Sequence, residues 1–186
     1  MRLRSTLFSV LAISALTLAM GCSAEPKTES RREALQADAK TTLRTLEAQD
    51  PGLQNVVENN YAYIVFPDVG KGGFGIGGAW GRGVVYEQGR FVGYAAVAEG
   101  SVGATAGGQT FSEVIVFNSR EAFRKFQSNR LSFGADASAV ALRAGAAASA
   151  EFRNGMAVFV ANQGGLMIDA SVKGQNISFV PADQLD

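Results

Sequence analysis

The pattern of apolar and polar positions predicts two helices at the start of the folded chain. Ser30 and Glu33 have the spacing of a capping box. Apolar side chains then recur on one narrow stripe of an amphipathic helix that runs to about Ala48, at Leu35, Ala39, Leu43 and Leu46. Asp50-Pro51 is typical of an N-cap followed by proline at the first helical position, so a second, short helix is expected there.

The rest of the chain has the pattern of short strands joined by glycine turns. A strand over residues 61–66 is expected to end at Pro67. Residues 70–83 contain eight glycines, which indicates backbone that bends sharply or is closely approached by another segment. Further strands are predicted over residues 84–86, 90–97, 111–117, 156–161, 166–172 and 176–180, with an ambiguous Ala-rich stretch at 136–150. Between them, residues 118–121 can cap a helix that carries Phe123 and Phe126.

Strands without regular helical crossovers predict an α+β fold. We expect an antiparallel, glycine-kinked sheet that curls or forms a barrel-like β core, with the N-terminal amphipathic helix and one or two further helices packed on it. Residues 30–186 are expected to form a single domain.

The first residues have the pattern of an export signal. Arg2 and Arg4 precede an apolar run that is shorter than a membrane-spanning helix needs, and Gly21-Cys22 follows. The text before Cys22 resembles a bacterial lipobox, which predicts a signal peptide over residues 1–21, a diacylglycerol and palmitate-like acyl anchor on Cys22, and a tether over 22–29. Ser23 after the cysteine favours the outer membrane, facing the periplasm. The alternative is an ordinary secreted protein with a stray thiol.

The composition excludes several kinds of chemistry. The 186 residues contain no histidine and one cysteine, so Ser-His-Asp triads and Cys/His zinc sites are impossible. The 17 basic and 17 acidic residues balance, which argues against a nucleic-acid partner. Carboxylates are scattered singly and suggest no carboxylate pair; they include Asp68, Glu87, Glu99, Asp136 and Asp169. We therefore predict a protein that is not an enzyme, with no catalytic residues, cofactor or metal site.

The residues from Gly73 to Gly78 match the dinucleotide fingerprint G-x-G-x-x-G. That motif needs a helix N-terminus after it to receive the pyrophosphate, and the text that follows is not helical. A glycine-kinked strand, with Phe74 and Ile76 facing one way, is the better interpretation.

Basic residues at two places could contact anionic lipid. Lys71 and Arg82 bracket the glycine segment and could form an anion nest for a phosphate headgroup, or could simply be solvated. Arg31 and Arg32 lie near the helical stripe, as in a helix that rests on an anionic membrane with Leu35 and Leu43 dipping in. The alternative is that this stripe packs onto the sheet.

Several segments, taken in order, resemble the SYLF domain of the YSC84-like family. They are Tyr63-Ile64-Val65-Phe66-Pro67, residues 70–75 and 81–85, Gly103-Ala104-Thr105-Ala106-Gly107-Gly108-Gln109, residues 114–117, Phe133-Gly134-Ala135-Asp136-Ala137-Ser138, and Gly164-Gly165-Leu166-Met167. The resemblance spans roughly residues 30 to 180 and is specific in order and spacing.

The resemblance implies lipid binding. Eukaryotic members are similar modules that bind phosphoinositide membranes through an N-terminal amphipathic helix and basic residues, and some associate with actin. The helix maps here onto residues 30–48, with Arg31 and Arg32 as headgroup contacts. We therefore expect a membrane-anchored, non-enzymatic lipoprotein of the bacterial envelope that binds anionic, phosphoinositide-like phospholipid headgroups. The alternative is a structural lipoprotein that binds another envelope protein and touches the membrane only through its anchor.

Overall fold

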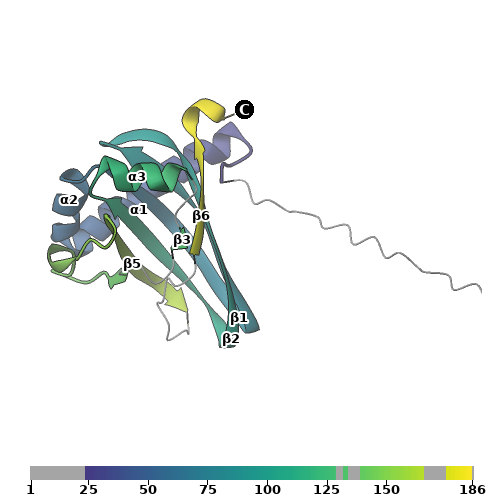
Figure 1. The fold of residues 1–186 in the computed structure, drawn as a ribbon. Helices are drawn as coiled ribbons and strands as arrows, with labels where there is room; N and C mark the ends of the chain where they lie inside the picture. Colours follow the sequence, from purple (N-terminus) through teal and green to yellow (C-terminus); the bar gives the residue numbers. More distant parts are fainter. Residues whose placement is uncertain (1–23, 129–131, 134–138, 166–174, 186) are drawn as a thin grey trace, which may run out of the picture.

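The computed structural model describes residues 24–128, 132–133, 139–165 and 175–185 (Figure 1). Within these ranges, the side chains of residues 74–76, 101–106, 132–133, 139 and 164–165 are not described. The predicted signal peptide, the anchor on Cys22, the strand over 166–172 and the orientation of Phe74 and Ile76 all lie outside this description. The same holds for Asp136 and Asp169.

Helices α1 (Glu29–Gln49) and α2 (Pro51–Glu58) open the described chain. The predicted capping box is wrong, because α1 begins one residue before Ser30 with Thr28 at its N-cap, and no side chain caps it. The predicted cap of α2 is confirmed, since the Asp50 side chain accepts a hydrogen bond from the amide of Gly52. Helix α3 (Arg120–Gln127) also begins where predicted, with the Ser119 side chain accepting from the amide of Ala122.

Two very long strands dominate the sheet. Strand β1 (Ala62–Glu87) pairs antiparallel with β2 (Arg90–Phe117) along nearly their whole length. The prediction that Pro67 ends a strand is wrong, because β1 passes through it at a register shift between Phe66 and Val69. The Pro67 carbonyl accepts hydrogen bonds from the side chains of Ser112 and Gln163. The glycine segment is continuous strand, as the kinked-strand interpretation expected.

The shorter strands extend the sheet along the free edge of β2. Strand β5 (Met156–Gly165) pairs with residues 109–117 of β2, and β6 (Gln175–Pro181) pairs with residues 93–98. Strand β3 (Ser132–Phe133) adds to β6, and β4 (Ala139–Ala141) adds to β5. The predicted antiparallel sheet is corrected at one edge, because β4 runs parallel to β5. The fold is α+β with a mixed sheet that is not closed into a barrel. Two short 3₁₀ turns, Ala147–Ser149 and Ala182–Gln184, complete the described elements.

The first and second halves of β1 lie against each other. The rings of Tyr63 and Tyr86 stack with centroids 4.9 Å apart, and the Gln88 amide donates to the Tyr61 carbonyl over 3.0 Å. A β-carbon on Gly83 would lie only 2.8 Å from the Val65 carbonyl oxygen, so this approach requires glycine. The long hairpin is therefore folded over, and it forms two layers that continue into β5 and β6 respectively.

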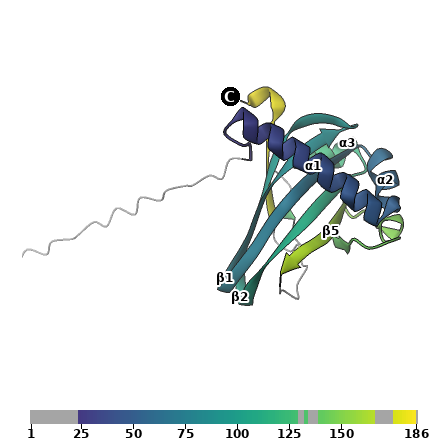
Figure 2. The ribbon, with the colours of Figure 1, turned by 180° about the vertical axis from the view of Figure 1, so that it is seen from behind.

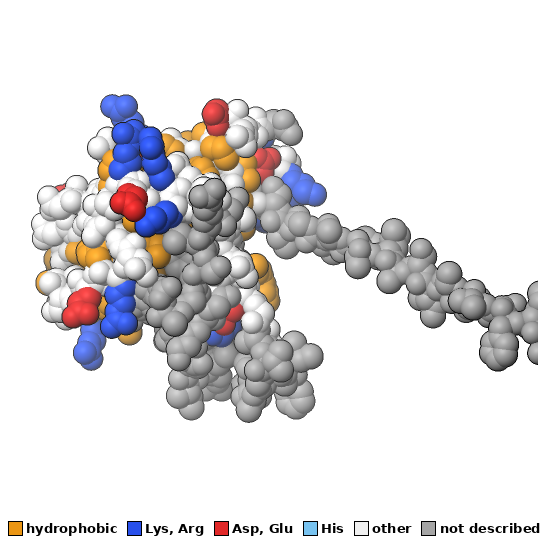
Figure 3. Space-filling view, in the orientation of Figure 1, with side chains coloured by type: hydrophobic (Ala, Val, Ile, Leu, Met, Phe, Trp, Pro, Cys, Tyr) orange, Lys and Arg blue, Asp and Glu red, His pale blue; other side chains and the backbone are white. Residues whose placement is uncertain are grey.

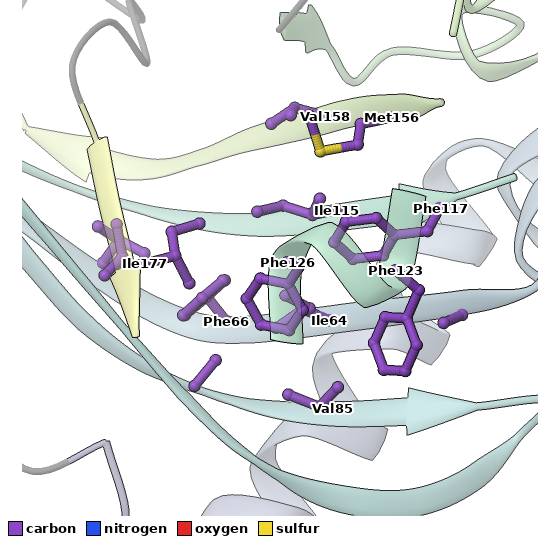
Figure 4. Close-up of a cluster of buried hydrophobic side chains, with 14 of the residues drawn as sticks. Ile64, Phe66, Val85, Ile115, Phe117, Phe123, Phe126, Met156, Val158 and Ile177 are labelled. Atoms are coloured by element: carbon purple, nitrogen blue, oxygen red, sulfur yellow. The ribbon is translucent and has the colours of Figure 1, made fainter. Parts of the chain in front are cut away.

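Apolar side chains fill both faces of this folded sheet. Between the layers, Phe123 and Phe126 of α3 pack against Phe117, and the strands supply Ile64, Phe66, Ile115 and Ile177 around them (Figure 4). On the outer face, α1 crosses the long strands (Figure 2), and Leu46 together with Leu53 of α2 covers Val65, Val84 and Tyr94.

Candidate functional site

A pocket of about 710 Å³ lies between the first half of α1 and the outer face of the sheet. Its floor comes from β1, β2 and β6, and its rim comes from α1 and the segment that precedes it. The lining residues are Pro26, Arg31, Ala34, Leu35, Asp38, Pro67, Asp68, Gly70, Trp80, Gly81, Arg82, Ala96, Val97, Ala98, Asn176, Ile177 and Ser178.

Strand alternation places the pocket floor on the same face as α1. Trp80 pairs with Ala98 and Arg82 pairs with Ala96, so these four side chains share the outer face. Because Ala96 and Ala98 are small, the space beside Trp80 and Arg82 is left unfilled and forms the pocket. Trp80 is 64% exposed, and a β-carbon on Gly70 would lie 3.3 Å from its indole ring, so glycine at this position leaves room for the ring.

Four charged residues line the pocket. Arg31 and Asp38 come from α1, Arg82 comes from β1, and Asp68 comes from the irregular stretch of β1 after Pro67. All four are exposed. Two guanidinium groups and two carboxylates leave the pocket without net charge, so the arginines can contact a phosphate without a strong attraction for every anion.

The structure brings together three of the predicted lipid-binding residues, Arg31, Leu35 and Arg82. Arg32 and Leu43, on the same helix as Arg31, are not in the lining. Arg32 is half-buried, with its Nε 3.6 Å from a Glu29 carboxylate oxygen. Leu43 is also half-buried, and it packs against the apolar side chains between α1 and the outer face of the sheet, the outer apolar cluster. Leu35 also packs against that cluster, and Leu46 is buried in it, as the sheet-packing alternative expected.

Lys71 does not lie beside Arg82. Its side chain is buried between the layers, where its Nζ is 3.4 Å from Glu99 Oε1, whereas Arg82 is exposed on the outer face. The structure therefore does not form the anion nest suggested by the sequence, because alternation along β1 sends the two side chains to opposite faces.

Sequence reasoning missed a buried polar cluster between the layers. It consists of Lys71, Glu99, Gln109, Glu113 and Gln175, each less than 9% exposed. The expectation of isolated carboxylates is corrected here, because Glu99 is close enough to Glu113 to raise its pKa. Burial is the largest cause and, with Glu99, it raises the pKa of Glu113 to about 7, while a hydrogen bond from Gln175 acts in the opposite direction. Polar residues at inward positions of otherwise apolar strands were the available signal.

In the part of the chain that the structure describes, no three acidic or Cys side chains are grouped so that they could hold a metal ion. Among those same residues, no helix is long and apolar enough to cross a membrane.

Comparison with known proteins gives two matches. Residues 98–182 match the family model described as "Ysc84: Las17-binding protein actin regulator". Over 152 residues, or 80% of this chain, the sequence is 27% identical to Beta cell expansion factor A of Aeromonas veronii. The match covers 58% of that protein, so the chain spans little more than half of its length. The family match contains β6 and the polar cluster except Lys71, while α1, Trp80 and Arg82 precede it.

Proposed function

Since this chain belongs to the Ysc84 (SYLF) family over residues 98–182, we propose that it is a non-enzymatic module that binds membrane phospholipid in the pocket beneath α1. The observation that carries the proposal is that one pocket gathers Arg31, Leu35 and Arg82 beside an exposed tryptophan. We further propose that Cys22 carries the acyl anchor, in the bacterial envelope and more specifically on the periplasmic side of the outer membrane.

The chemistry of the pocket suits a phospholipid at a membrane surface. The two arginine side chains present planar groups of N–H donors that match phosphate oxygens. The apolar wall, which includes Leu35, Ala96 and Ala98, can accept the glycerol region and the first methylenes of an acyl chain. Tryptophan is enriched at membrane interfaces because its ring is apolar and its N–H is polar, and Trp80 has this exposure.

The pocket also lies close to the proposed anchor. Pro26 lines it and is four residues after Cys22 in sequence, a separation that extended chain spans in at most roughly 14 Å. An acylated Cys22 would hold the pocket mouth near the bilayer and raise the local concentration of headgroups. Asp38 and Asp68 offset the arginines, so we expect the preference for anionic over zwitterionic phospholipid to be modest.

The test uses Trp80, which is the one tryptophan of the chain and therefore reports on the pocket alone. A chain that begins at Ser23, without the acyl anchor, is mixed with anionic or zwitterionic vesicles, and sedimentation and tryptophan emission are recorded. We expect a blue shift and binding that the variant Arg31→Glu/Arg82→Glu weakens by about tenfold or more, because each basic residue near the surface contributes about 1 kcal/mol.

The matched control is Lys40→Glu/Arg44→Glu, which makes the same charge change at exposed positions of α1 outside the pocket. If both variants lose binding equally, general charge and not the pocket attracts the lipid. If the unanchored chain binds no vesicle, the acyl chain is the sole membrane contact and the proposal fails.

A protein-binding role is the second candidate, and a specific surface favours it. Basic side chains gather over α3 on the face opposite α1 (Figure 3), and Arg120, Arg124 and Lys125 are exposed there. The family description names a protein partner, Las17. An acidic envelope protein would suit this surface. If Arg120→Glu/Arg124→Glu loses vesicle binding and the pocket variant Arg31→Glu/Arg82→Glu does not, then lipid binds at α3 and the pocket site is refuted.

A further inference from the structure

The buried polar cluster joins the two layers of the folded sheet. Lys71 stands on the first half of β1 and Glu99 on the first half of β2, so their ion pair crosses from one layer to the other. Glu113 stands on the second half of β2, beside β5, while Gln175 begins β6. The Gln175 side chain donates to Glu113 Oε2 over 3.2 Å, and this contact also crosses between the layers.

The cluster lies toward the glycine-rich middle of β1, where one layer passes into the other. Glu113 is two residues from Ile115 and Gln175 is two residues from Ile177, and both isoleucines point into the apolar interior (Figure 4). Because side chains alternate along a strand, Glu113 and Gln175 point into the same interior, each two residues before its isoleucine. There, these polar contacts join the layers beside the buried ring of Phe111.

Several acceptor oxygens of the cluster have no donor opposite them within the described ranges. Three of its oxygens are buried with no hydrogen-bond partner among the described residues, namely Glu99 Oε2, Glu113 Oε1 and Gln175 Oε1. The charged groups described on this face are Glu99 and its partner Lys71, and the ladder neighbours of Glu113 are the apolar Phe66 and Val160. One ammonium cannot neutralise two carboxylates, so an added proton removes both the excess charge and one unmatched acceptor.

We propose that Glu113 is a proton-controlled clasp, in which the neutral acid holds the two layers together next to the glycine-rich middle of β1 and the carboxylate loosens them. The proton comes from solvent. In the neutral state, the new O–H of Glu113 can donate to Gln175 Oε1 or Glu99 Oε2. When the proton leaves, Glu113 becomes a second buried carboxylate near Glu99, and opening of the layers lets water reach it.

The sign of the pH dependence follows from the direction of the shift. The pKa of Glu113 is raised from its ordinary value of 4.5 to about 7, so the closed state binds the proton more tightly than an opened state does. The closed arrangement is favoured fully below 4.5, and this contribution is lost as the pH rises toward 7. Between about pH 5 and about pH 8, the opened population should rise by a factor on the order of 10 to 100.

Hydrogen exchange of the full chain in detergent measures this opening, with Glu113→Gln as the neutral isostere and Glu121→Gln as control. Glu121 is an exposed carboxylate on α3 that pairs with Lys125, and its pKa is lowered by that partner. We expect amides of residues 69–73, 97–99, 109–113 and 175–177 to exchange faster in the wild type and the control than in Glu113→Gln at about pH 8. At about pH 5, the three proteins should exchange alike.

Equal exchange in the wild type and Glu113→Gln at both pH values would overturn the clasp. If the glutamine variant does not fold, the carboxyl carbon shift of Glu113 in the wild type still decides the matter. A titration midpoint near 7 supports the clasp, and a midpoint near the ordinary 4.5 refutes it. The experiment contains no lipid, so its result is independent of the proposed lipid-binding function.

Discussion

Tyr86 and Tyr94 lie in the same apolar cluster beneath α1, but their hydroxyl groups are in different situations. The Gln36 side chain donates to the Tyr94 hydroxyl over 2.7 Å. The Tyr86 hydroxyl is buried without a partner among the residues that the structure describes. Burial first, and then the neighbouring Tyr63 and Tyr94, raise the pKa of Tyr86 to about 12. A buried hydroxyl without a partner has lost its hydrogen bonds to water and gained none within the protein, which lowers the free energy of unfolding.

We expect Tyr86→Phe to leave the free energy of unfolding unchanged or to raise it by up to about 1 kcal/mol, because the unmatched hydroxyl is removed and the ring stays. Tyr94→Phe should lower it by about 1 kcal/mol, because Gln36 loses its acceptor. Urea unfolding of both variants measures the difference. A greater loss in Tyr86→Phe than in Tyr94→Phe would show that the Tyr86 hydroxyl has a partner.

At the scale of elements, Asp50 connects three segments of the chain. One carboxylate oxygen caps α2 at the Gly52 amide over 3.0 Å, and the other accepts from the Ala147 amide over 2.7 Å. Burial alone would raise the pKa of Asp50, but hydrogen bonds from the backbone amides of Ala147, Gly52, Gly145 and Ala146 outweigh it and lower the pKa. The carboxylate thus ties the α1–α2 junction to the 3₁₀ turn before β5.

We expect Asp50→Ala to lower the free energy of unfolding by about 2 to 4 kcal/mol, because a cap is lost and a buried amide is left unmatched. Ser119→Ala, which removes only the cap of α3, should cost about 1 kcal/mol. Because the folded pKa is lowered, the Asp50 contribution is present above the ordinary value of 3.8 and is lost as the pH falls through the folded pKa. Thermal unfolding at neutral and acid pH checks both statements, and equal losses in the two variants would contradict the role of the Ala147 contact.

At the scale of the whole molecule, the contact between the two halves of β1 decides the shape. A β-carbon on Gly83 would lie 2.7 Å from the Phe66 ring and 2.8 Å from the Val65 carbonyl oxygen. Gly100, in β2, has nothing within 4 Å of the corresponding position. The pocket lies on the outer face of this folded sheet and the polar cluster on its inner face, so the same fold positions both sites.

We expect Gly83→Ala to destabilise the fold by about 2 kcal/mol or more, because the added methyl group meets backbone that cannot move away without opening the contact. Gly100→Ala should change the free energy of unfolding by less than about 0.5 kcal/mol. Urea unfolding compares the two, and the near-ultraviolet circular dichroism of the stacked Tyr63 and Tyr86 reports on the contact itself. A Gly83→Ala protein as stable as Gly100→Ala would show that the halves of β1 do not need this close approach.

Local sequence determined the helices and most of the described strands. Asp50 before Pro51, and Ser119 before α3, mark helix starts because a short polar side chain satisfies free amides wherever the chain places it. The glycine density before Val84 indicated bent strand and not a nucleotide loop, since no helix follows it. The ordered SYLF-like segments indicated the family, which the match over residues 98–182 confirms.

Tertiary structure alone decided which distant residues meet. Pro67 was expected to end a strand, but a register shift carries β1 through it. Lys71 and Arg82 were paired by their nearness in sequence, yet alternation and the fold of β1 place Lys71 against Glu99 and Arg82 beneath α1 near Arg31. Glu113 and Gln175 are 62 residues apart, and no local pattern could join them. Side-chain periodicity fixes the face that a residue occupies, but only the folding of the long hairpin fixes what stands opposite, because that depends on contacts between segments far apart in the chain.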